Sequence, residues 1–221
     1  MLKIGVIGCG KITQVRHAPE YAENPECGLT AWYDALPERA QAMAEQYGGK
    51  AYASVDELLN SGLDAVSVCV ANSDHAGVTI RALEAGCHVL CEKPMATTLE
   101  DCLRMTEAAK KAGKRLLIGH NQRFARAHVE ARRMIEAGEI GRVLAFHTMF
   151  GHPGPEGWTG QSNSWFFDKS RAVFGAMADL GIHKTDLIHF LIGEPITSVS
   201  AMLGTVDKTY PDGSPVSVDD N

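Results

Sequence analysis

The chain has 221 residues, and its 21 Lys and Arg against 27 Asp and Glu give a formal net charge of −6. A chain of this length can bury about 70% of its unfolded surface. Its 45% hydrophobic and 22% charged residues exclude a disordered or fibrous protein. There is no excess of Lys and Arg to neutralise phosphates, so we expect no nucleic-acid partner. The longest apolar runs, such as residues 65–71, fall short of the roughly 20 residues that span a bilayer, so no membrane partner is expected.

The first residues enter an apolar, strand-like segment at once, so we expect no cleavable secretory signal and a cytoplasmic location. The six cysteines form no C-x-x-C pair, and we expect reduced thiols rather than a disulfide framework. Cys87 and Cys91 have no histidine partner at ligand spacing, so no metal site is expected there.

Short apolar runs alternate with segments of helical period over the first part of the chain. The expected strands, in chain order, are residues 3–7, 29–33, 50–52, 65–70, 88–91 and 115–118. The expected helices between them are residues 11–23, 37–47, 55–60, 73–85 and 99–112. Most of these strands are apolar on both faces, as parallel strands covered by helices are. The alternation predicts an α/β fold with a Rossmann-type doubly wound parallel sheet.

The rhythm changes after Gly119. The expected elements are then a helix at 127–137, a strand at 142–150, an irregular aromatic-rich loop at 151–168, a helix at 175–191 and a strand at 197–203. We predict a dinucleotide-binding domain over residues 1–122. Residues 123–221 are predicted to form a second, α+β domain.

A glycine-rich turn, Gly8-Cys9-Gly10-Lys11-Ile12-Thr13, closes the first strand and opens the first helix. Backbone N–H groups at a helix start, together with the helix dipole, can hold a pyrophosphate, so Gly8, Gly10, Lys11 and Ile12 are candidate cofactor contacts. Thr13 replaces the third glycine of the fingerprint, which loosens how closely helix and strand can approach. An ordinary tight turn is the alternative.

Asp34 ends the second strand, 24 residues after Gly10. A carboxylate here can accept hydrogen bonds from the adenosine ribose hydroxyls of NAD and repel the 2′-phosphate of NADP. We therefore predict NAD as the cofactor and favour NADP less, although Arg39 is near in sequence. Asp34 could instead cap the helix that starts at Pro37.

The sequence Cys91-Glu92-Lys93-Pro94 follows the fifth strand, at the sheet edge where open α/β proteins bind ligands. Proline restricts the backbone on both sides of its own bond, so Lys93 is presented from a stiff turn. Glu92 and Lys93 are therefore candidate site residues, although an isolated E-K-P is more often surface decoration.

Four motifs follow one another in the chain: AVSVCVANSDH (65–75), AGCHVLCEKP (85–94), GHNQRF (119–124) and GAMADLGIHKTD (175–186). Together they resemble the family of glucose-fructose oxidoreductase, inositol dehydrogenase and rhizopine catabolism proteins (Gfo/Idh/MocA), over nearly the whole chain. Ala71 departs from the pattern, since the family usually has proline there. The resemblance implies hydride transfer between a nicotinamide ring and a carbon that bears a hydroxyl, commonly on a sugar or cyclitol.

Lys93, Asp179 and His183 match the catalytic positions of that family. Asp179 and His183 are four residues apart in an expected helix and so project from one face. Neutral imidazole suits removal of the hydroxyl proton near neutral pH, so His183 is the predicted base. Lys93 would stabilise negative charge on the reacting oxygen, and Asp179 would orient substrate hydroxyls or the lysine. A solvated helix face is the alternative.

Three further positions have two interpretations each. Asn72 and His75 resemble cofactor-side residues of the family. In the alternative interpretation Ser73 or Asn72 caps the helix and His75 is exposed. Arg123 could contact the cofactor amide or the substrate, or form a salt bridge between the domains. The aromatic residues of the loop could form a sugar-stacking wall or anchor the loop, namely Trp158, Trp165 and Phe166.

These features predict an NAD(P)-dependent oxidoreductase that acts on a secondary alcohol of a sugar, inositol or related polyol. The alternatives are an NAD-dependent glycosidase that oxidises its sugar transiently and a non-catalytic dinucleotide or sugar sensor. We expect a homo-oligomer, a dimer or tetramer formed through the second-domain sheet. The resemblance implies that residues 123–221 form a substrate and oligomerisation domain with an open, mainly antiparallel sheet. That domain is considerably larger in the family than the about 100 residues left here, so we expect a truncated sheet with exposed edges, or further chain beyond Asn221.

Overall fold

In the computed structural model the described residues are 1–160 and 164–221, and nothing is assigned to the side chain of Trp158. The chain divides into two compact units, Met1–Gly119 and His120–Asn221. Within the described residues no helix has the length and apolar character needed to cross a bilayer. All six cysteines lie among the described residues as free thiols.

The first unit is built on a parallel sheet of six strands within residues 1–119. The strands are β1 (Leu2–Ile7), β2 (Cys27–Tyr33), β3 (Lys50–Ala51), β4 (Ala65–Val68), β5 (His88–Cys91) and β6 (Leu116–Ile118). Their order is β3-β2-β1-β4-β5-β6, and each neighbouring pair is parallel. The predicted Rossmann-type sheet is confirmed. Because the chain reverses direction across the sheet between β1 and β4, the carboxyl edge there is the place where such sheets bind ligands.

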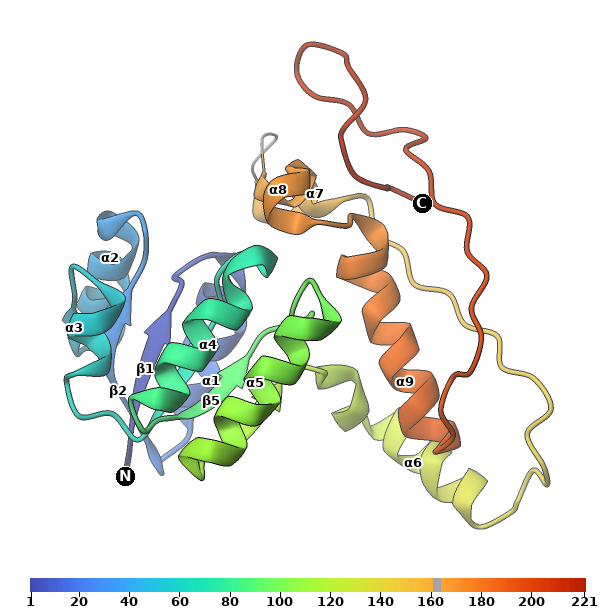
Figure 1. Cartoon of the computed structure of the whole chain (residues 1–221), viewed down its shortest axis with the longest axis horizontal. Helices are drawn as coiled ribbons and strands as arrows, with labels where there is room; N and C mark the ends of the chain where they lie inside the picture. The colour runs from blue at the N-terminus through green and yellow to red at the C-terminus, as the bar shows by residue number, and fades with distance from the viewer. Residues whose placement is uncertain (161–163) are drawn as a thin grey trace. The chain divides into compact units, whose positions relative to one another are not determined.

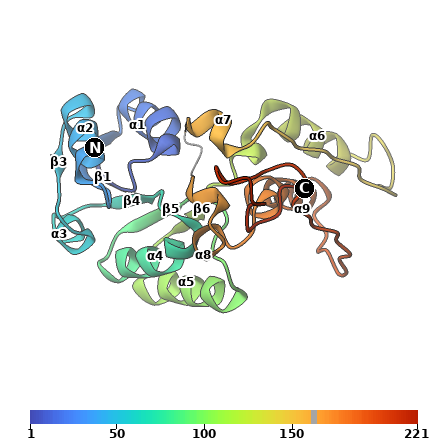
Figure 2. The same cartoon turned by 90° about the horizontal axis from the view of Figure 1, so that it is seen from above.

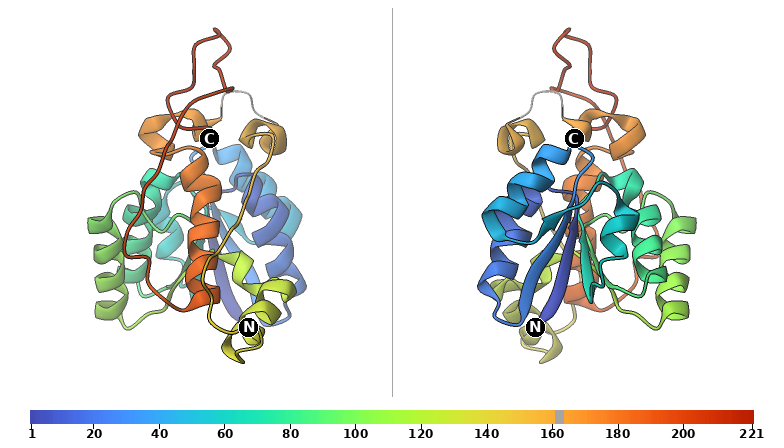
Figure 3. Two further views of the ribbon diagram at one scale, coloured as in Figure 1. Left: turned by 90° about the vertical axis from the view of Figure 1, so that its right-hand side faces the viewer. Right: turned by 90° about the vertical axis from the view of Figure 1, so that its left-hand side faces the viewer.

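Helices cover both faces of this sheet (Figure 2). They are η1 (Thr13–His17, a π-helical turn), α1 (Ala18–Glu23), α2 (Pro37–Tyr47), α3 (Val55–Leu59), η2 (Asn72–Asp74, a 3₁₀ turn), α4 (His75–Glu84) and α5 (Leu99–Ala112). α1 and α2 lie on one face, and α4 and α5 lie on the other (Figures 2 and 3). The buried Trp32 and Met43 join the sheet to the first face, and Leu58, Leu83 and Met105 join it to the second. Each such side chain contributes about 1.5–3 kcal/mol by burial.

Local sequence signals explain where these helices begin and end, and α5 shows them together. The Thr98 hydroxyl accepts the Asp101 amide at 3.1 Å, which caps the first turn. Two acidic residues follow in the first turn, and Lys110 and Lys111 lie in the last turn, as the helix dipole favours. Gly113 ends the helix in the left-handed conformation (φ 64°). The observed helix, Leu99–Ala112, therefore coincides with the predicted one.

The regular elements among the described residues of the second unit are all helical. Its elements are η3 (Asn121–Phe124, a 3₁₀ turn), α6 (Arg126–Glu136), α7 (Pro155–Thr159), η4 (Trp165–Phe167, a 3₁₀ turn), α8 (Lys169–Ala172), η5 (Met177–Gly181, a π-helical turn) and α9 (Ile182–Ile192). α6 packs beside α9, visible in Figure 1 as the yellow-green and orange helices. A small buried cluster of Phe167, Ala172, Val216 and Val218 joins the segment after α7 to the end of the described chain.

The strands expected in this unit do not form. Residues 142–150 and 197–203 run without strand pairing, and within 120–160 and 164–221 the only ladder contact is an isolated bridge between Thr209 and Pro215. A strand needs a neighbour for its N–H and C=O groups, and sequence alternation alone does not supply one. Apolar side chains stay exposed there, with Leu144 at 80% and Met202 at 98%. The predicted irregular loop 151–168 contains the turns α7 and η4, where Pro155 starts α7; residues 161–163 of that loop lie outside the described part.

Candidate active site

The glycine-rich turn joins β1 to the first helix at the carboxyl edge of the sheet. Gly8 has φ +98°, and a Cβ there would collide with the Cys69 carbonyl group after β4, so no other residue fits without strain. The first hydrogen bond of the helix is donated by the Gln14 amide to the Gly10 carbonyl oxygen at 3.2 Å. The amides of Lys11, Ile12 and Thr13 precede it and so are not used within the helix. This is the donor arrangement that holds a pyrophosphate.

Thr13, which stands where the fingerprint has its third glycine, is fully buried. Its hydroxyl donates to the Gly8 carbonyl at 2.6 Å, so the residue ties the helix to the turn. The π-helical turn η1 starts at Thr13 and gives the wider first turn that this side chain needs. The expected loosening is therefore offset by a hydrogen bond.

Asp34 follows β2 and reaches back to the glycine-rich turn. Its Oδ2 accepts the Cys9 amide at 2.7 Å, and its Oδ1 accepts the Leu36 amide at 2.9 Å. The N-cap of α2 is Leu36, which receives no side-chain cap. Asp34 therefore holds the amide of the N-cap residue of α2 as well as the turn. Its carboxylate stands beside the turn where the adenosine ribose of a dinucleotide lies in this type of sheet.

The turn that carries Lys93 leaves β5, and its Lys93-Pro94 bond is cis. His75, at the start of α4, is 1% exposed, and its Nδ1 lies 2.6 Å from the Pro94 carbonyl oxygen. Its Nε2 lies 3.2 Å from the Val70 carbonyl oxygen. Burial lowers the pKa of His75, so the ring is neutral and its proton belongs on Nδ1, at the shorter contact. The exposed alternative is wrong, because the His75 side chain is buried and holds the turn. The cofactor contact of His75 stays a prediction.

Glu92, the residue before Lys93, belongs to a buried polar network. His17 Nε2 lies 2.8 Å from Glu92 Oε1, and the second Glu92 oxygen accepts the Lys93 amide at 3.2 Å. On its other side, His17 Nδ1 lies 3.2 Å from the Ser67 hydroxyl, which lies 2.8 Å from the Tyr21 hydroxyl. The network therefore links the first helix to the ends of β4 and β5.

The electrostatics of the pair favour its charged form. Burial alone would lower the pKa of His17, but the Cys69 sulfur and the Glu92 carboxylate raise it to about 10. Burial would likewise raise the pKa of Glu92, but the hydrogen bond and the charge of His17 lower it. Gly119, after β6, closes the other side of this carboxylate, since a Cβ there would lie 3.1 Å from Glu92 Oε2. Asn72 in η2 is also buried. The N-cap residue of α4 is Asp74, whose side chain does not cap the helix.

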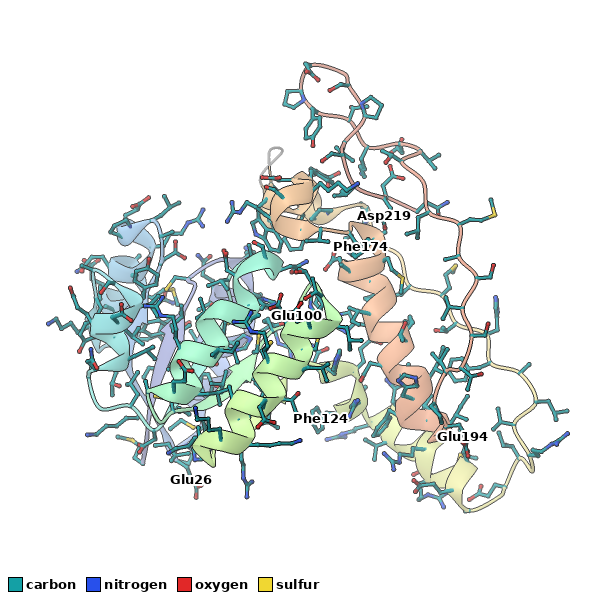
Figure 4. All side chains as sticks on the ribbon, viewed as in Figure 1. Glu26, Glu100, Phe124, Phe174, Glu194 and Asp219 are labelled. Carbon is teal, nitrogen blue, oxygen red and sulfur yellow. The ribbon has the colours of Figure 1, made fainter. Side chains whose placement is uncertain are left out.

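In the second unit, Asp179 lies in η5 and His183 lies in the first turn of α9. A π turn rotates the chain less per residue than an α turn, so it moves residues four apart closer to one face. The start of this helix is held from far along the sequence (Figure 4): Asp219 accepts the Gly175 and Met177 amides, each at 2.8 Å. A Cβ on Gly175 would collide with the Asp219 carbonyl oxygen, which explains the glycine.

A pocket of about 450 Å³, open to solvent, lies beside this helix start. His152, Phe166, Asp179, Lys208 and Asp219 are among its lining residues. His152 Nδ1 accepts the Gly154 amide at 2.9 Å, so its proton sits on Nε2 and points to Asp179 Oδ2 at 3.2 Å. The pocket therefore presents a carboxylate held by an imidazole next to an aromatic ring, a combination suited to hydroxyl-rich ligands.

Arg123 forms a two-pronged ion pair with the buried Asp186, with Nε 2.7 Å from Oδ2. This contact raises the pKa of Arg123. Of the two sequence interpretations, the structure has the ion pair, but within the second unit rather than between domains. The aromatic residues Trp165 and Phe166 stack at 4.0 Å between ring centroids, while the third member of that predicted wall, the Trp158 side chain, lies outside the described part.

Four residues of these arrangements were missed by sequence reasoning: His17, Ser67, His152 and Asp219. His17 carried a weak signal, as a histidine on the helix that follows the glycine-rich turn. The other three depend on contacts between segments far apart in the chain, for which the sequence has no local sign. Among the described residues, no three His, Cys, Asp or Glu side chains are grouped to hold a metal ion.

Comparison with family models assigns both units. Residues 2–120 match the GFO/IDH/MocA model described as "Oxidoreductase family, NAD-binding Rossmann fold", and residues 128–221 match the GFO/IDH/MocA C-terminal domain. The chain belongs to the GFO/IDH/MocA oxidoreductase family. The family resemblance seen in the sequence is thereby confirmed.

Named relatives agree with this membership. The chain is 34% identical over 204 residues to D-glucoside 3-dehydrogenase of Escherichia coli, covering 90% of this chain and 57% of that protein. It is 33% identical over 202 residues to myo-inositol 2-dehydrogenase of Thermotoga maritima, covering 90% and 58%. A solved structure of levoglucosan dehydrogenase with NADH and levoglucosan matches with a TM-score of 0.85 at 31% identity, over 99% of this chain and 61% of that one. The chain thus spans little more than half the length of these relatives.

Proposed function

We propose that the protein is an NAD-dependent oxidoreductase that removes hydride from a secondary alcohol of a sugar, inositol or related polyol. The observation that carries the proposal is the carboxyl edge of the sheet. There Gly8 with its positive φ, the helix-start amides, Asp34 and the Lys93 turn follow strands β1, β2 and β5 of one parallel sheet. The sugar and inositol dehydrogenases among its relatives support the substrate class.

The residues of the first unit fit a dinucleotide. The amides of Lys11 and Ile12, beside Gly8 and Gly10, would hold the pyrophosphate. Asp34 would accept the ribose hydroxyls, and its charge disfavours a 2′-phosphate, so NAD is preferred over NADP. A bound NAD supplies a hydride acceptor. We keep Asn72, Glu92, Lys93 and Arg123 as proposed cofactor-side residues. Two of them form ion pairs: Glu92 with His17 and Arg123 with Asp186.

The chemistry beyond the hydride is a proton transfer and charge stabilisation. His183 would take the hydroxyl proton, since imidazole has a suitable pKa near neutrality. The Lys93 ammonium would stabilise the negative charge that develops on the oxygen. Asp179, oriented by His152, would hold a neighbouring substrate hydroxyl. A solvated face would not need the imidazole contact that Asp179 makes in the pocket.

The organisation of the whole protein is also proposed. Residues 1–122 would bind the cofactor, and residues 123–221 would bind substrate and form a homo-oligomer in the cytoplasm. Residues 142–150 and 197–203 form no strands in the described chain, but their exposed apolar side chains would be covered if these segments paired in an open antiparallel sheet of the homo-oligomer. Hydrogen exchange tests this sheet, because pairing would protect alternate amides in both segments, whereas fast exchange throughout would contradict it.

A two-stage ligand screen tests the function. Thermal unfolding is first measured with NAD and with NADP, since a ligand at about 100 times its Kd stabilises the native state by about 2.7 kcal/mol. A panel of polyols and sugars is then added with NAD, and NADH absorbance is followed. We expect NAD to stabilise more than NADP, and NADH to accumulate with at least one polyol. Release of a glycosidic leaving group without NADH accumulation would instead support the glycosidase alternative.

A further inference from the structure

The histidine of the first helix, His17, has no assigned role in the proposed function, although it is buried against the turn that presents Lys93. Its side chain is 8% exposed and that of Glu92 is 15% exposed. Four groups from neighbouring elements face the ring: Cys69 and Ser67 of the β4 segment, Tyr21 of α1 and Glu92 after β5. Lys93 follows Glu92 directly and also lowers the pKa of that carboxyl.

A buried ion pair carries a large desolvation cost, so stability alone does not account for its presence here. Apolar residues of similar size often give equal or greater stability at such places. This part of the sheet already has a close-packed apolar core, with Val68 and Cys91 fully buried nearby. The position of the pair, one residue before Lys93, instead indicates a role in the electrostatics of that lysine.

The charges of the three side chains give the physical link. With His17 protonated, Glu92 is neutralised by a partner inside the fold, and the trio carries one net positive charge, that of Lys93. With a neutral residue at position 17, the Glu92 carboxylate would remain as an unbalanced charge beside the ammonium. The two charges interact, since Lys93 lowers the pKa of the Glu92 carboxyl, so an unbalanced carboxylate would attract the ammonium in competition with a ligand oxygen.

We infer that His17 is a positioning residue whose imidazolium neutralises Glu92 and thereby keeps the Lys93 ammonium available to the reacting oxygen. The inference rests on the proposed function for what Lys93 does, but not for the charge state of His17. His75 complements it from the opposite face of the sheet. As a neutral ring it donates a hydrogen bond to the Pro94 carbonyl oxygen. His17 thus sets the charge beside the turn, and His75 holds the backbone of the turn.

The charge state of His17 is tested first, without any turnover. Nitrogen NMR of the imidazole rings is recorded from about pH 5 to pH 9, with the His17 signals assigned by their loss in His17→Gln. We expect an imidazolium throughout in the parent protein, and a ring whose pKa lies below that of the parent in Glu92→Gln, where the Cys69 sulfur is left as the group that raises it. A neutral His17 ring in the parent at pH 7, or an unchanged titration in Glu92→Gln, would overturn the inference.

Protein stability gives a second readout of the same charge. In the folded protein the pKa of His17 is raised to about 10, above its ordinary value of 6.5. The stabilisation is therefore complete below pH 6.5 and is lost as the pH rises toward 10. We expect the free energy of unfolding to decline over that range in the parent and to stay flatter in the double variant His17→Gln/Glu92→Gln. Equal slopes would contradict the inference.

Kinetics separate positioning from plain structure. We expect His17→Gln to lower kcat about tenfold or more with little change in the KM for NAD, since small displacements of catalytic groups have such effects. The double variant, which removes the unbalanced carboxylate, should recover most of the loss. Arg16→Gln is the matched control, because it removes an exposed charge one residue earlier and should leave kcat unchanged. If the double variant is as slow as His17→Gln, or if the loss of kcat is accompanied by an equal loss of NAD affinity, His17 has a structural role only.

If the parent itself shows no turnover, the proposed function fails, while the NMR titration still decides the charge of His17.

Discussion

The two units hold their chemistry-bearing residues by different means. In Met1–Gly119, Gly8, Asp34 and Lys93 each follow a strand of one parallel sheet, and two buried histidines fix the Lys93 turn. In His120–Asn221 the helix of Asp179 and His183 starts on a carboxylate 40 residues or more away in sequence. The first arrangement follows from local strand and turn rules. The second depends on long-range side-chain contacts, so it should be the more easily disturbed.

The largest expected effect tests whether both units serve one reaction. Lys93→Met and His183→Ala should each lower kcat by about 10²–10⁴-fold, the contribution of a positioned acid, base or charge-stabilising group. Steady-state NADH formation with the substrate found in the panel measures this. Lys110→Met, which changes an exposed lysine of α5, is the control. Turnover within a few-fold of the parent in both site variants would show that the catalytic assignment is wrong.

A pair of glycine variants sharpens the account of the first unit. Gly10→Ala meets no atom within 4 Å, so it should keep the stability of the parent but lower NAD affinity by about 10–100-fold, because the methyl group displaces charge-assisted hydrogen bonds to the pyrophosphate. Gly8→Ala should lower stability itself, by about 1–3 kcal/mol, through its positive φ. Isothermal titration and urea unfolding separate the two. If Gly10→Ala binds NAD as the parent does, the glycine-rich segment is an ordinary tight turn and not a pyrophosphate site.

Asp34→Asn tests the cofactor preference. The amide oxygen can still accept a backbone N–H, but the charge that binds ribose hydroxyls and repels a 2′-phosphate is lost. We expect NAD affinity to fall about tenfold and the preference for NAD over NADP to shrink. Competitive titration with both dinucleotides measures the ratio. An unchanged ratio would mean that Asp34 serves only the Cys9 and Leu36 amides.

The smallest effect concerns the helix of the second unit. Asp219→Ala removes the acceptor of two amides at the helix start and should cost about 0.5–2 kcal/mol, as other lost N-terminal caps do. Urea unfolding with Asp207→Ala as the control measures this, since the Asp207 side chain is 85% exposed. If Asp219→Ala matches the control, the helix does not depend on the long-range contact, and the contrast between the units disappears.

Much of the first unit could be predicted from the sequence because its signals are local. Apolar runs gave the strands, and the glycine-rich turn and E-K-P segment marked the carboxyl edge. The burial of His75 could not be predicted, because it depends on which carbonyl groups the fold brings to the ring. His17 and His152 could not be assigned, since their partners Glu92 and Asp179 lie 75 and 27 residues away. The expected strands at 142–150 and 197–203 failed because alternation shows a face but not a partner.

The transfer of a labelled hydride tests the central claim most directly. The protein is incubated with NAD and a polyol that carries deuterium on the carbon bearing the reacting hydroxyl, and the nicotinamide product is examined by mass spectrometry. The proposed function predicts deuterium in the NADH ring and a ketone in the polyol product, with both lost in Lys93→Met. NADH without deuterium, or polyol turnover with no label in the nicotinamide ring, would contradict it.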